Sequence, residues 1–232
     1  MATVTVVVST WLPDGPDGEL RLVNLEETLK SWDRHLLNGK RKRDIRYFVC
    51  DDWSEPYLYA RLARLLCARS PAPFLTSQPR RGVGASLNRG FTAAFEQGDI
   101  AAYFVDDWML TAPLDLVPWV KLLEEDESIG MVRLGPPHPG TTGRVEMTAD
   151  GWALRLNREG FAFGHRPALY HRRFIEAYGP FAEGTSALEC ERLYNERFAA
   201  TPGPDIVLAL PHPWQHCDGP ELAYIEPSEE RA

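Results

Sequence analysis

Residues 100–107 read Ile-Ala-Ala-Tyr-Phe-Val-Asp-Asp, an apolar run that stops abruptly at two acids. Such a short, continuously apolar run is typical of a strand buried on both faces of a parallel sheet. Residues 45–52, Ile-Arg-Tyr-Phe-Val-Cys-Asp-Asp, end in the same way, and residues 4–9 form an earlier β-branched run. Because ligands gather at the carboxyl ends of parallel strands, we expect the turns Asp51-Asp52-Trp53 and Asp106-Asp107-Trp108 to face one crevice.

Helical spacing of apolar residues separates these strands. The pattern predicts helices over about 22–37, 55–68, 85–97, 114–125, 172–178 and 186–199, strands over 74–76, 129–134 and 206–210, and a hairpin of 144–148 with 152–157 around Asp150-Gly151. Pro13 to Gly18 is expected to be a turn, and Pro211 to Cys217 a loop. Strands alternating with helices indicate an α/β fold with a mostly parallel, Rossmann-like central sheet.

The chain has 232 residues, which fits a single domain. Its four cysteines form no Cys-x-x-Cys pair, and no secretory leader is recognisable, so we expect a cytoplasmic location. No apolar run approaches the roughly 18 residues that span a bilayer, so we expect no membrane span.

The formal net charge is −8, which argues against a surface built as a whole to bind a polyanion. A local basic run between Arg34 and Arg46 includes Lys40, Arg41 and Lys42. A run of this kind is more often a solvated loop than a nucleic-acid contact.

Two common nucleotide motifs are absent. Gly82-Val83-Gly84 begins like a dinucleotide fingerprint, but the third glycine would fall at Leu87. No Gly-Lys-Ser or Gly-Lys-Thr forms a Walker loop. The stretch from Thr10 to Gly18 contains no Lys or Arg to hold a triphosphate, which disfavours nucleotidyl transfer.

The order of the remaining motifs is more informative. A first strand is followed by Val49-Cys50-Asp51-Asp52, then by Gly82-Val83-Gly84-Ala85-Ser86-Leu87-Asn88-Arg89-Gly90, then by Tyr103-Phe104-Val105-Asp106-Asp107. This order and spacing resemble the family 2 glycosyltransferases, which are inverting, nucleotide-sugar-dependent enzymes with the GT-A fold. The resemblance is good over about residues 4–110 and loose beyond. It implies one GT-A domain over 1–232, with a nucleotide-sugar-binding half of about 1–110 and an acceptor-binding half of about 111–232.

The resemblance assigns roles to the first half of the chain. Asp51 or Asp52 would bind the base or ribose of a nucleoside-diphosphate sugar, with Thr10 beside it. Asn88 and Arg89 would lie near the nucleotide.

The same resemblance places a divalent cation, Mn²⁺ or Mg²⁺, at Asp106 and Asp107, where it would bridge the diphosphate. The family's second metal-binding acid falls on Trp108, so we expect Asp107 to ligate the metal and Trp108 to pack against the donor. Some family members place a histidine after a late strand near the metal. Here we favour His216 over His212, and an imidazole ligand would favour manganese.

The resemblance also implies a carboxylate base at an acidic helix start. The nearest match is Leu188-Glu189-Cys190-Glu191, where Cys190 occupies the position that the family usually fills with Asp. Glu189 and Glu191 remain the candidates, with Glu189 the better placed in sequence.

The sequence therefore predicts a metal-assisted glycosyltransferase, and the resemblance implies inversion at the anomeric carbon. Its hydroxyl acceptor is open: a glycan, a small molecule, a protein or a modified nucleobase in DNA. Nucleotidyl transfer and a non-catalytic nucleotide- or sugar-binding module are the alternatives.

Overall fold

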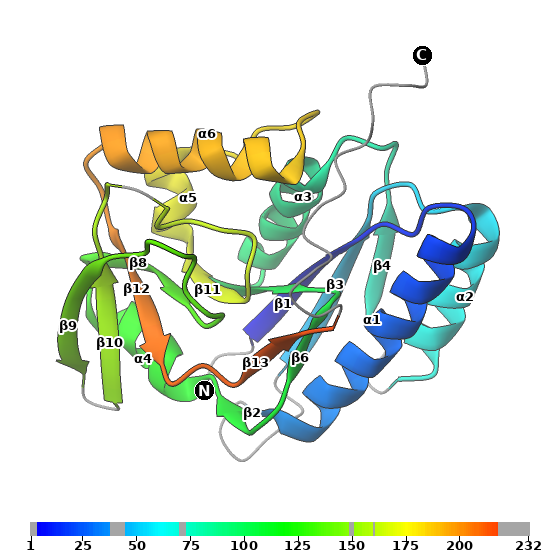
Figure 1. Cartoon of the computed structure of the whole chain (residues 1–232), viewed down its shortest axis with the longest axis horizontal. Coiled ribbons are helices and arrows are strands. Elements are labelled where there is room, and N and C mark those ends of the chain that lie inside the picture. Colours follow the sequence, from blue (N-terminus) through cyan, green and yellow to red (C-terminus); the bar gives the residue numbers. More distant parts are fainter. Residues whose placement is uncertain (1–3, 38–44, 70–72, 149–150, 160, 218–232) are drawn as a thin grey trace.

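A computed structural model describes residues 4–37, 45–69, 73–148, 151–159 and 161–217 (Figure 1). In the first half of the chain the elements are β1 (Val4–Thr10), α1 (Pro16–His35), β2 (Leu36–Leu37), β3 (Ile45–Asp51), α2 (Pro56–Cys67), β4 (Phe74–Ser77), α3 (Val83–Phe95), β5 (Ile100–Val105) and β6 (Trp108–Leu110). In the second half they are β7 (Leu114–Asp115), α4 (Val117–Glu125), β8 (Ile129–Arg133), β9 (Gly143–Thr148), β10 (Gly151–Leu156), β11 (Ala168–His171), α5 (Arg172–Tyr178), α6 (Ala187–Ala200), β12 (Asp205–Leu210) and β13 (Trp214–His216).

Within the described part of the chain, nine strands form one sheet in the order β4-β3-β1-β5-β11-β8-β12-β10-β9. The strands β4, β3, β1 and β5 pair in parallel, as do β8 and β12. Strand β11 is antiparallel between β5 and β8, and the β9–β10 hairpin adds antiparallel pairing at one edge. The mostly parallel sheet that the sequence predicted is confirmed, and Figure 1 shows β9 and β4 at its opposite edges.

Helices cover both faces of the sheet and bury a core on each. Helices α1, α2 and α4 pack on one face around residues such as Trp32, Leu62 and Leu123. Helices α3, α5 and α6 pack on the other around Phe91, Phe174 and Tyr194. The continuous burial of β1 follows from this sandwich, because its side chains point alternately into the two cores.

Two glycines set how closely α3 approaches the second half of the chain. Gly82 has a φ of +82°, a conformation that favours glycine. A Cβ atom added at Gly84 would lie 1.9 Å from the carbonyl oxygen of Ala182. The Gly82-Val83-Gly84 stretch therefore serves close packing at the start of α3.

The sequence-based expectations differ from the structure mainly in short elements and boundaries, and β2 and β6 were not predicted. Helix α1 begins at Pro16, inside the stretch expected to be a turn, because proline suits the first helical turn. Leu114 begins strand β7 and not the next helix. Strand β11 was missed, since four residues directly before a helix give too short a period to recognise. The segment expected as a loop from Pro211 contains β13, which pairs with β6.

Some sequence-based expectations fall outside the described residues. These are the basic residues 40–43 and Asp150 of the expected hairpin turn. Among the helices that are described, none combines the length and the apolar character needed to cross a membrane.

Candidate functional site

The carboxyl ends of β1 and β5 meet at a buried carboxylate. Parallel pairing of the two strands brings Thr10 close to Asp106, and the Thr10 hydroxyl donates to Asp106 Oδ2 over 2.8 Å. One guanidinium nitrogen of Arg21, from α1, lies 3.5 Å from the same oxygen. Burial raises the pKa of Asp106, and the positive charge of Arg21 opposes that shift. Asp106 therefore ties together the two strands that frame the crevice.

Asp107 meets His216 from the far end of the chain. Strand β13 pairs antiparallel with β6 and places His216 opposite Trp108. His216 Nε2 lies 3.1 Å from Asp107 Oδ2, although 109 residues separate them in sequence. The backbone N–H of Cys217 donates to the carbonyl oxygen of Asp107 over 2.8 Å, which fixes the approach of β13. The structure thus brings together the two residues that the sequence analysis selected as metal ligands.

The second carboxylate oxygen of Asp107 makes no contact of this kind. Asp107 Oδ1 is shielded from solvent and has no hydrogen-bond partner among the described residues. A buried carboxylate oxygen without a partner is costly, so such an atom commonly marks a place for an ion or a water. The described residues contain no cluster of three or more His, Cys, Asp or Glu side chains that could hold a metal. A cation here would need further ligands from a bound molecule.

Trp108 packs beside the Asp107–His216 pair. Its ring lies 5.3 Å from the ring of His216, edge to face, and its carbonyl oxygen accepts a bond from the indole of Trp32. The guanidinium of Arg166 lies 5.6 Å from the centre of the Trp108 ring. Trp108 therefore contacts both His216 and Arg166.

The acids after β3 are held inside the protein. The carboxylate of Asp51 accepts hydrogen bonds from the backbone N–H and hydroxyl of Ser54 and, over 2.7 Å, from the hydroxyl of Ser77. Asp52 accepts from the backbone N–H groups of Arg81, at 2.8 Å, and Gly82, at 2.9 Å. Both aspartates are buried. Their oxygens therefore shape the turn after β3 and hold the loop that leads into α3.

Trp11, which the sequence analysis missed, follows Thr10 at the same rim. The guanidinium of Arg80 lies 3.8 Å from the centre of its ring, and that of Arg21 lies 6.0 Å away. The available signal was its place, directly after a predicted strand in a Rossmann-like sheet, where ligands gather. Trp53, in the acidic turn, is exposed and has a φ of 67°.

Asn88 and Arg89 join α3 to neighbouring segments. The Asn88 amide donates to the carbonyl oxygen of Phe181 and accepts from its N–H, at 3.0 and 2.8 Å. Arg89 donates to the carbonyl oxygen of Ser77 over 3.0 Å. Both line a groove of about 450 Å³ along α3, whose lining does not include Asp106, Asp107 or His216.

The two candidate bases on α6 have opposite surroundings. Glu189 pairs with Arg192 through both oxygens, each at 2.7 Å, and the hydrogen bond from Arg192 lowers the pKa of Glu189. Glu191 points inward, where its Oε1 accepts the backbone N–H of His165 over 2.5 Å. Burial raises the pKa of Glu191, and the His165 N–H and the charges of Arg166 and Arg133 oppose this shift.

The residues beside Glu191 are buried as well. Cys190 is buried in the core between α3 and α6, and burial raises the pKa of its thiol to about 11. His165 stands beside Glu191 with both ring nitrogens shielded, and burial lowers the pKa of the imidazole to about 3. The Cys190 thiol is neutral because its pKa is raised. Glu191 is therefore the ionisable group on the inner side of the start of α6.

This chain is similar to known proteins in its three-dimensional structure. No family model and no curated protein matches the chain. The mannosyltransferase PcManGT from Pyrobaculum calidifontis, in complex with GDP-Man and Mn²⁺, is 18% identical with a TM-score of 0.57, covering 89% of this chain and 56% of that one. S. aureus TarS 1–349 with UDP-GlcNAc is 13% identical with a TM-score of 0.59, covering 98% and 62%. GalNAc-T7 with UDP, GalNAc and Mn²⁺ is 14% identical with a TM-score of 0.60, covering 89% and 41%.

The chain thus spans less than two thirds of the length of each of these proteins. At such low identity the likeness concerns the arrangement of helices and strands. The three similar structures are GT-A-type glycosyltransferases. The structure therefore confirms that this chain has the GT-A fold that its motif order predicted.

Proposed function

We propose that the protein is a glycosyltransferase that moves a sugar from a nucleoside-diphosphate sugar to a hydroxyl acceptor. The contact between Asp107 and His216 supports this most strongly, because it joins a carboxylate and an imidazole at the carboxyl end of β5 in a GT-A fold. Similar structures hold GDP-Man with Mn²⁺ and UDP-GlcNAc. A nucleoside-diphosphate sugar suits the carboxyl ends of β1 and β5, where Trp11 lies near two arginines and Asp107 contacts His216.

Asp107 and His216 would hold a divalent cation. The unpartnered Asp107 Oδ1 fits a cation, and His216 offers a nitrogen ligand that suits Mn²⁺ better than Mg²⁺. With only two protein ligands, oxygens of the donor diphosphate would complete the coordination. When bound, the cation offsets the negative charge that builds on the leaving diphosphate.

The rim at the carboxyl ends of β1 and β3 would hold the nucleoside. Trp11 offers an aromatic face for a base. The hydrogen bond between Thr10 and Asp106 would hold the neighbouring end of β1 in place. Asp51 and Asp52 would act here by holding the turns around the nucleoside, since their carboxylates already accept internal hydrogen bonds. Asn88 would keep α3 against residue 181, and Arg89 would hold Ser77 at the end of β4.

Glu191 is the base that the geometry favours. A base must be free to take a proton, whereas Glu189 is already paired with Arg192 at the surface. Glu191 faces inward beside Arg166, which in turn lies over Trp108. Its raised pKa brings it closer to the working range of a general base.

The reaction would then invert the anomeric carbon. Glu191 takes the proton of the acceptor hydroxyl as that oxygen attacks the anomeric carbon, and the bond to the diphosphate breaks on the opposite side. Arg166 and Trp108 would border the sugar, which would lie between Glu191 and the diphosphate. This role would place the acceptor beside the start of α6.

Donor consumption tests the proposal. The protein is incubated with UDP-, GDP- and dTDP-sugars and Mn²⁺, and released nucleoside diphosphate is measured. We expect release with one of these donors, its loss in Asp107→Asn, and normal release in Asp99→Asn, an exposed carboxylate that pairs with Arg172. A donor that is bound and protected indicates a binding module instead. Release of pyrophosphate from nucleoside triphosphates would indicate nucleotidyl transfer.

The acceptor class can be narrowed with the same assay. A DNA acceptor would make transfer weaken steeply with salt, because binding then depends on displaced counterions. A glycan or a small molecule would not show that dependence. The acidic net charge favours the latter two.

A further inference from the structure

Strand β9 is an edge strand with one exposed apolar face. It is hydrogen-bonded to β10 on one side, and the sheet order of the described residues ends with it (Figure 1). Val145 is 58% exposed and Met147 is 76% exposed, and both share a face with Trp152 of β10, which is 56% exposed. Edge strands normally carry charges or prolines that prevent pairing with another chain. Strand β9 carries the charges of Arg144 and Glu146 on one face, but the face of Val145 and Met147 lacks this protection.

The open hydrogen-bonding groups of β9 can be identified from the hairpin register. Asn157 N–H donates to the carbonyl oxygen of Thr142, so these opposite residues form a hydrogen-bonded pair. Hydrogen-bonded and non-hydrogen-bonded pairs alternate along an antiparallel ladder. Gly143, Val145 and Met147, opposite Leu156, Leu154 and Trp152, are therefore in non-hydrogen-bonded pairs. Their N–H and C=O groups point away from β10, toward the open edge.

We propose that a second copy of this chain pairs with this edge, β9 against β9, in an antiparallel two-fold dimer. The register is centred on Val145, opposite Val145 of the partner subunit. Gly143 then pairs with the partner's Met147, and Met147 with the partner's Gly143. All three outward-facing residues are used, and the apolar faces of the two hairpins become continuous. An isologous contact of this kind closes on itself and does not extend into a fibre.

The charges on the other face select this register. Arg144, whose side chain is 80% exposed, lies opposite the partner's Glu146 in a non-hydrogen-bonded pair, where side chains approach closely. Moving the axis to residue 144 would set Arg144 against its own copy, and moving it to 146 would set the two glutamates together. Either shift also leaves one outward-facing residue of each strand unpaired. Hydrogen bonding and charge therefore agree on the same centre.

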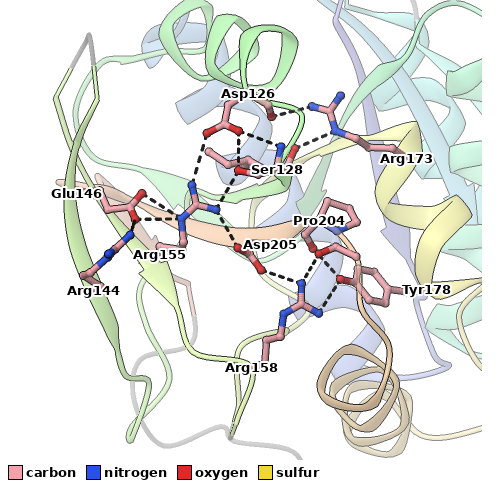
Figure 2. Close-up of polar contacts among 12 residues, drawn as sticks. Asp126, Ser128, Arg144, Glu146, Arg155, Arg158, Arg173, Tyr178, Pro204 and Asp205 are labelled. Carbon is pink, nitrogen blue, oxygen red and sulfur yellow. Dashed lines mark hydrogen bonds and ion pairs between the residues drawn. The ribbon is translucent and has the colours of Figure 1, made fainter.

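The hairpin is held firmly enough to present this edge. Figure 2 shows Arg155 of β10 bonded to Glu146, with both distances 3.1 Å, and to Asp205 of β12 at 2.9 Å. Arg158 bonds the other oxygen of Asp205 at 2.8 Å. Arg144 of the same strand also donates to Glu146, over 2.6 Å. Glu146 is thus fixed in place, and the partner's Arg144 would join the two arginines that already contact this carboxylate.

The test is the mass of the full chain in solution, measured by sedimentation equilibrium over a range of concentrations. We expect a twofold rise in mass with concentration. Val145→Pro removes an outward N–H at the dimer axis but no hydrogen bond to β10, so the variant is expected to fold and remain monomeric. Arg144→Glu, which places Glu opposite the partner's Glu146, is expected to raise the dissociation constant at least about tenfold.

Hydrogen exchange on the unmodified protein provides a readout that does not depend on variants. The amides of Val145 and Met147 are expected to be protected only at concentrations where the mass has doubled. A chain that stays monomeric throughout overturns the proposal. So does a dimer that Arg144→Glu leaves intact, or one that leaves both amides unprotected, since it would use another surface.

Discussion

His216 Nε2 lies 3.1 Å from Asp107 Oδ2 because β13 returns to pair with β6. This contact makes the candidate metal site depend on two strands that lie far apart in the sequence. The sequence offers an incomplete acidic motif at Asp106–Asp107, with tryptophan in the place of the second acid. The structure places an imidazole within 3.1 Å of the remaining carboxylate, and in the proposed site this nitrogen would stand in for the missing oxygen ligand.

Replacing His216 should therefore weaken metal binding. With UDP or GDP present, His216→Ala is expected to reduce Mn²⁺ affinity by at least about tenfold, a size that losing even an outer-shell partner can reach. Electron paramagnetic resonance measures free Mn²⁺ directly and needs no turnover. His212→Ala is the matched control, since it removes a histidine from the same segment outside the pair. Equal affinity in both variants would exclude His216 as a ligand.

Glu191→Gln should reduce sugar transfer by about 10²- to 10⁴-fold if Glu191 is the general base. Glu189→Gln removes a carboxylate two residues away that is paired with Arg192, and is expected to leave transfer close to normal. The measurement is kcat with a donor that the protein consumes. A loss in Glu189→Gln with normal Glu191→Gln would reverse the assignment.

The pH dependence of transfer gives an independent check on Glu191. The base must be ionised, and burial raises its pKa above the usual 4.5. The rate should therefore fall on the acidic side at a pH above that of an ordinary glutamate. Glu191→Gln should abolish this limb of the profile. An acidic limb that survives in the variant belongs to another group.

The same shift predicts a trade between stability and function. A carboxyl whose pKa is raised in the folded state favours folding fully below its unfolded pKa, and this contribution is lost as the pH rises through the folded pKa. Glu191→Gln should thus raise the free energy of unfolding at neutral pH and have little effect in acid. Urea denaturation at the two pH values measures this difference. A variant less stable at neutral pH would show that the charge of Glu191 is fully compensated by Arg133 and Arg166.

Asp52 should matter for stability, because it accepts the backbone N–H groups of both Arg81 and Gly82. Asp52→Ala leaves two donors without their acceptor, and each is worth about 1–3 kcal/mol when it stays buried. Asp52→Asn keeps one acceptor and is expected to cost less. Urea denaturation ranks the variants, and an Asp52→Ala protein as stable as the parent would contradict this role.

Gly84→Ala tests the close packing of α3. The added Cβ would meet the carbonyl oxygen of Ala182 at 1.9 Å, so backbone must move, at a cost of typically about 1–3 kcal/mol. Gly98→Ala is the control, because nothing lies within 4 Å of its added Cβ. Thermal denaturation should lower the midpoint in the first variant alone. Equal midpoints would show that the segment at Ala182 yields without cost.

The fold was largely predictable because buried parallel strands leave continuous apolar runs. The runs at 4–10, 45–51 and 100–105 are strands, and both acidic turns follow their carboxyl ends. Short elements without such a run were missed: β11 has four residues, and β13 has three in a segment rich in proline and histidine. Their pairing depends on partners far away in the sequence.

The site was only partly predictable for a related reason. Residue type and order selected Asp107, His216 and the two glutamates of α6, and favoured Glu189 over Glu191, whereas the geometry favours Glu191. That choice depends on which side of α6 faces the core, and on Arg192, which occupies Glu189 at the surface. The internal bonds of Asp51 and Asp52 were likewise invisible, because their donors are serine hydroxyls and backbone groups that no motif marks.

Cooperative binding of nucleotide and metal tests the central claim most directly. Thermal unfolding is followed with UDP or GDP, with Mn²⁺, and with both, for the parent protein and for Asp107→Asn. A ligand that binds only the native state at about 100 times its Kd stabilises by about 2.7 kcal/mol. We expect nucleotide and Mn²⁺ together to raise the Tm by more than the sum of their separate shifts, and Asp107→Asn to lose this excess. An additive response, or an equal one in the variant, would contradict a metal-bridged donor site at Asp107.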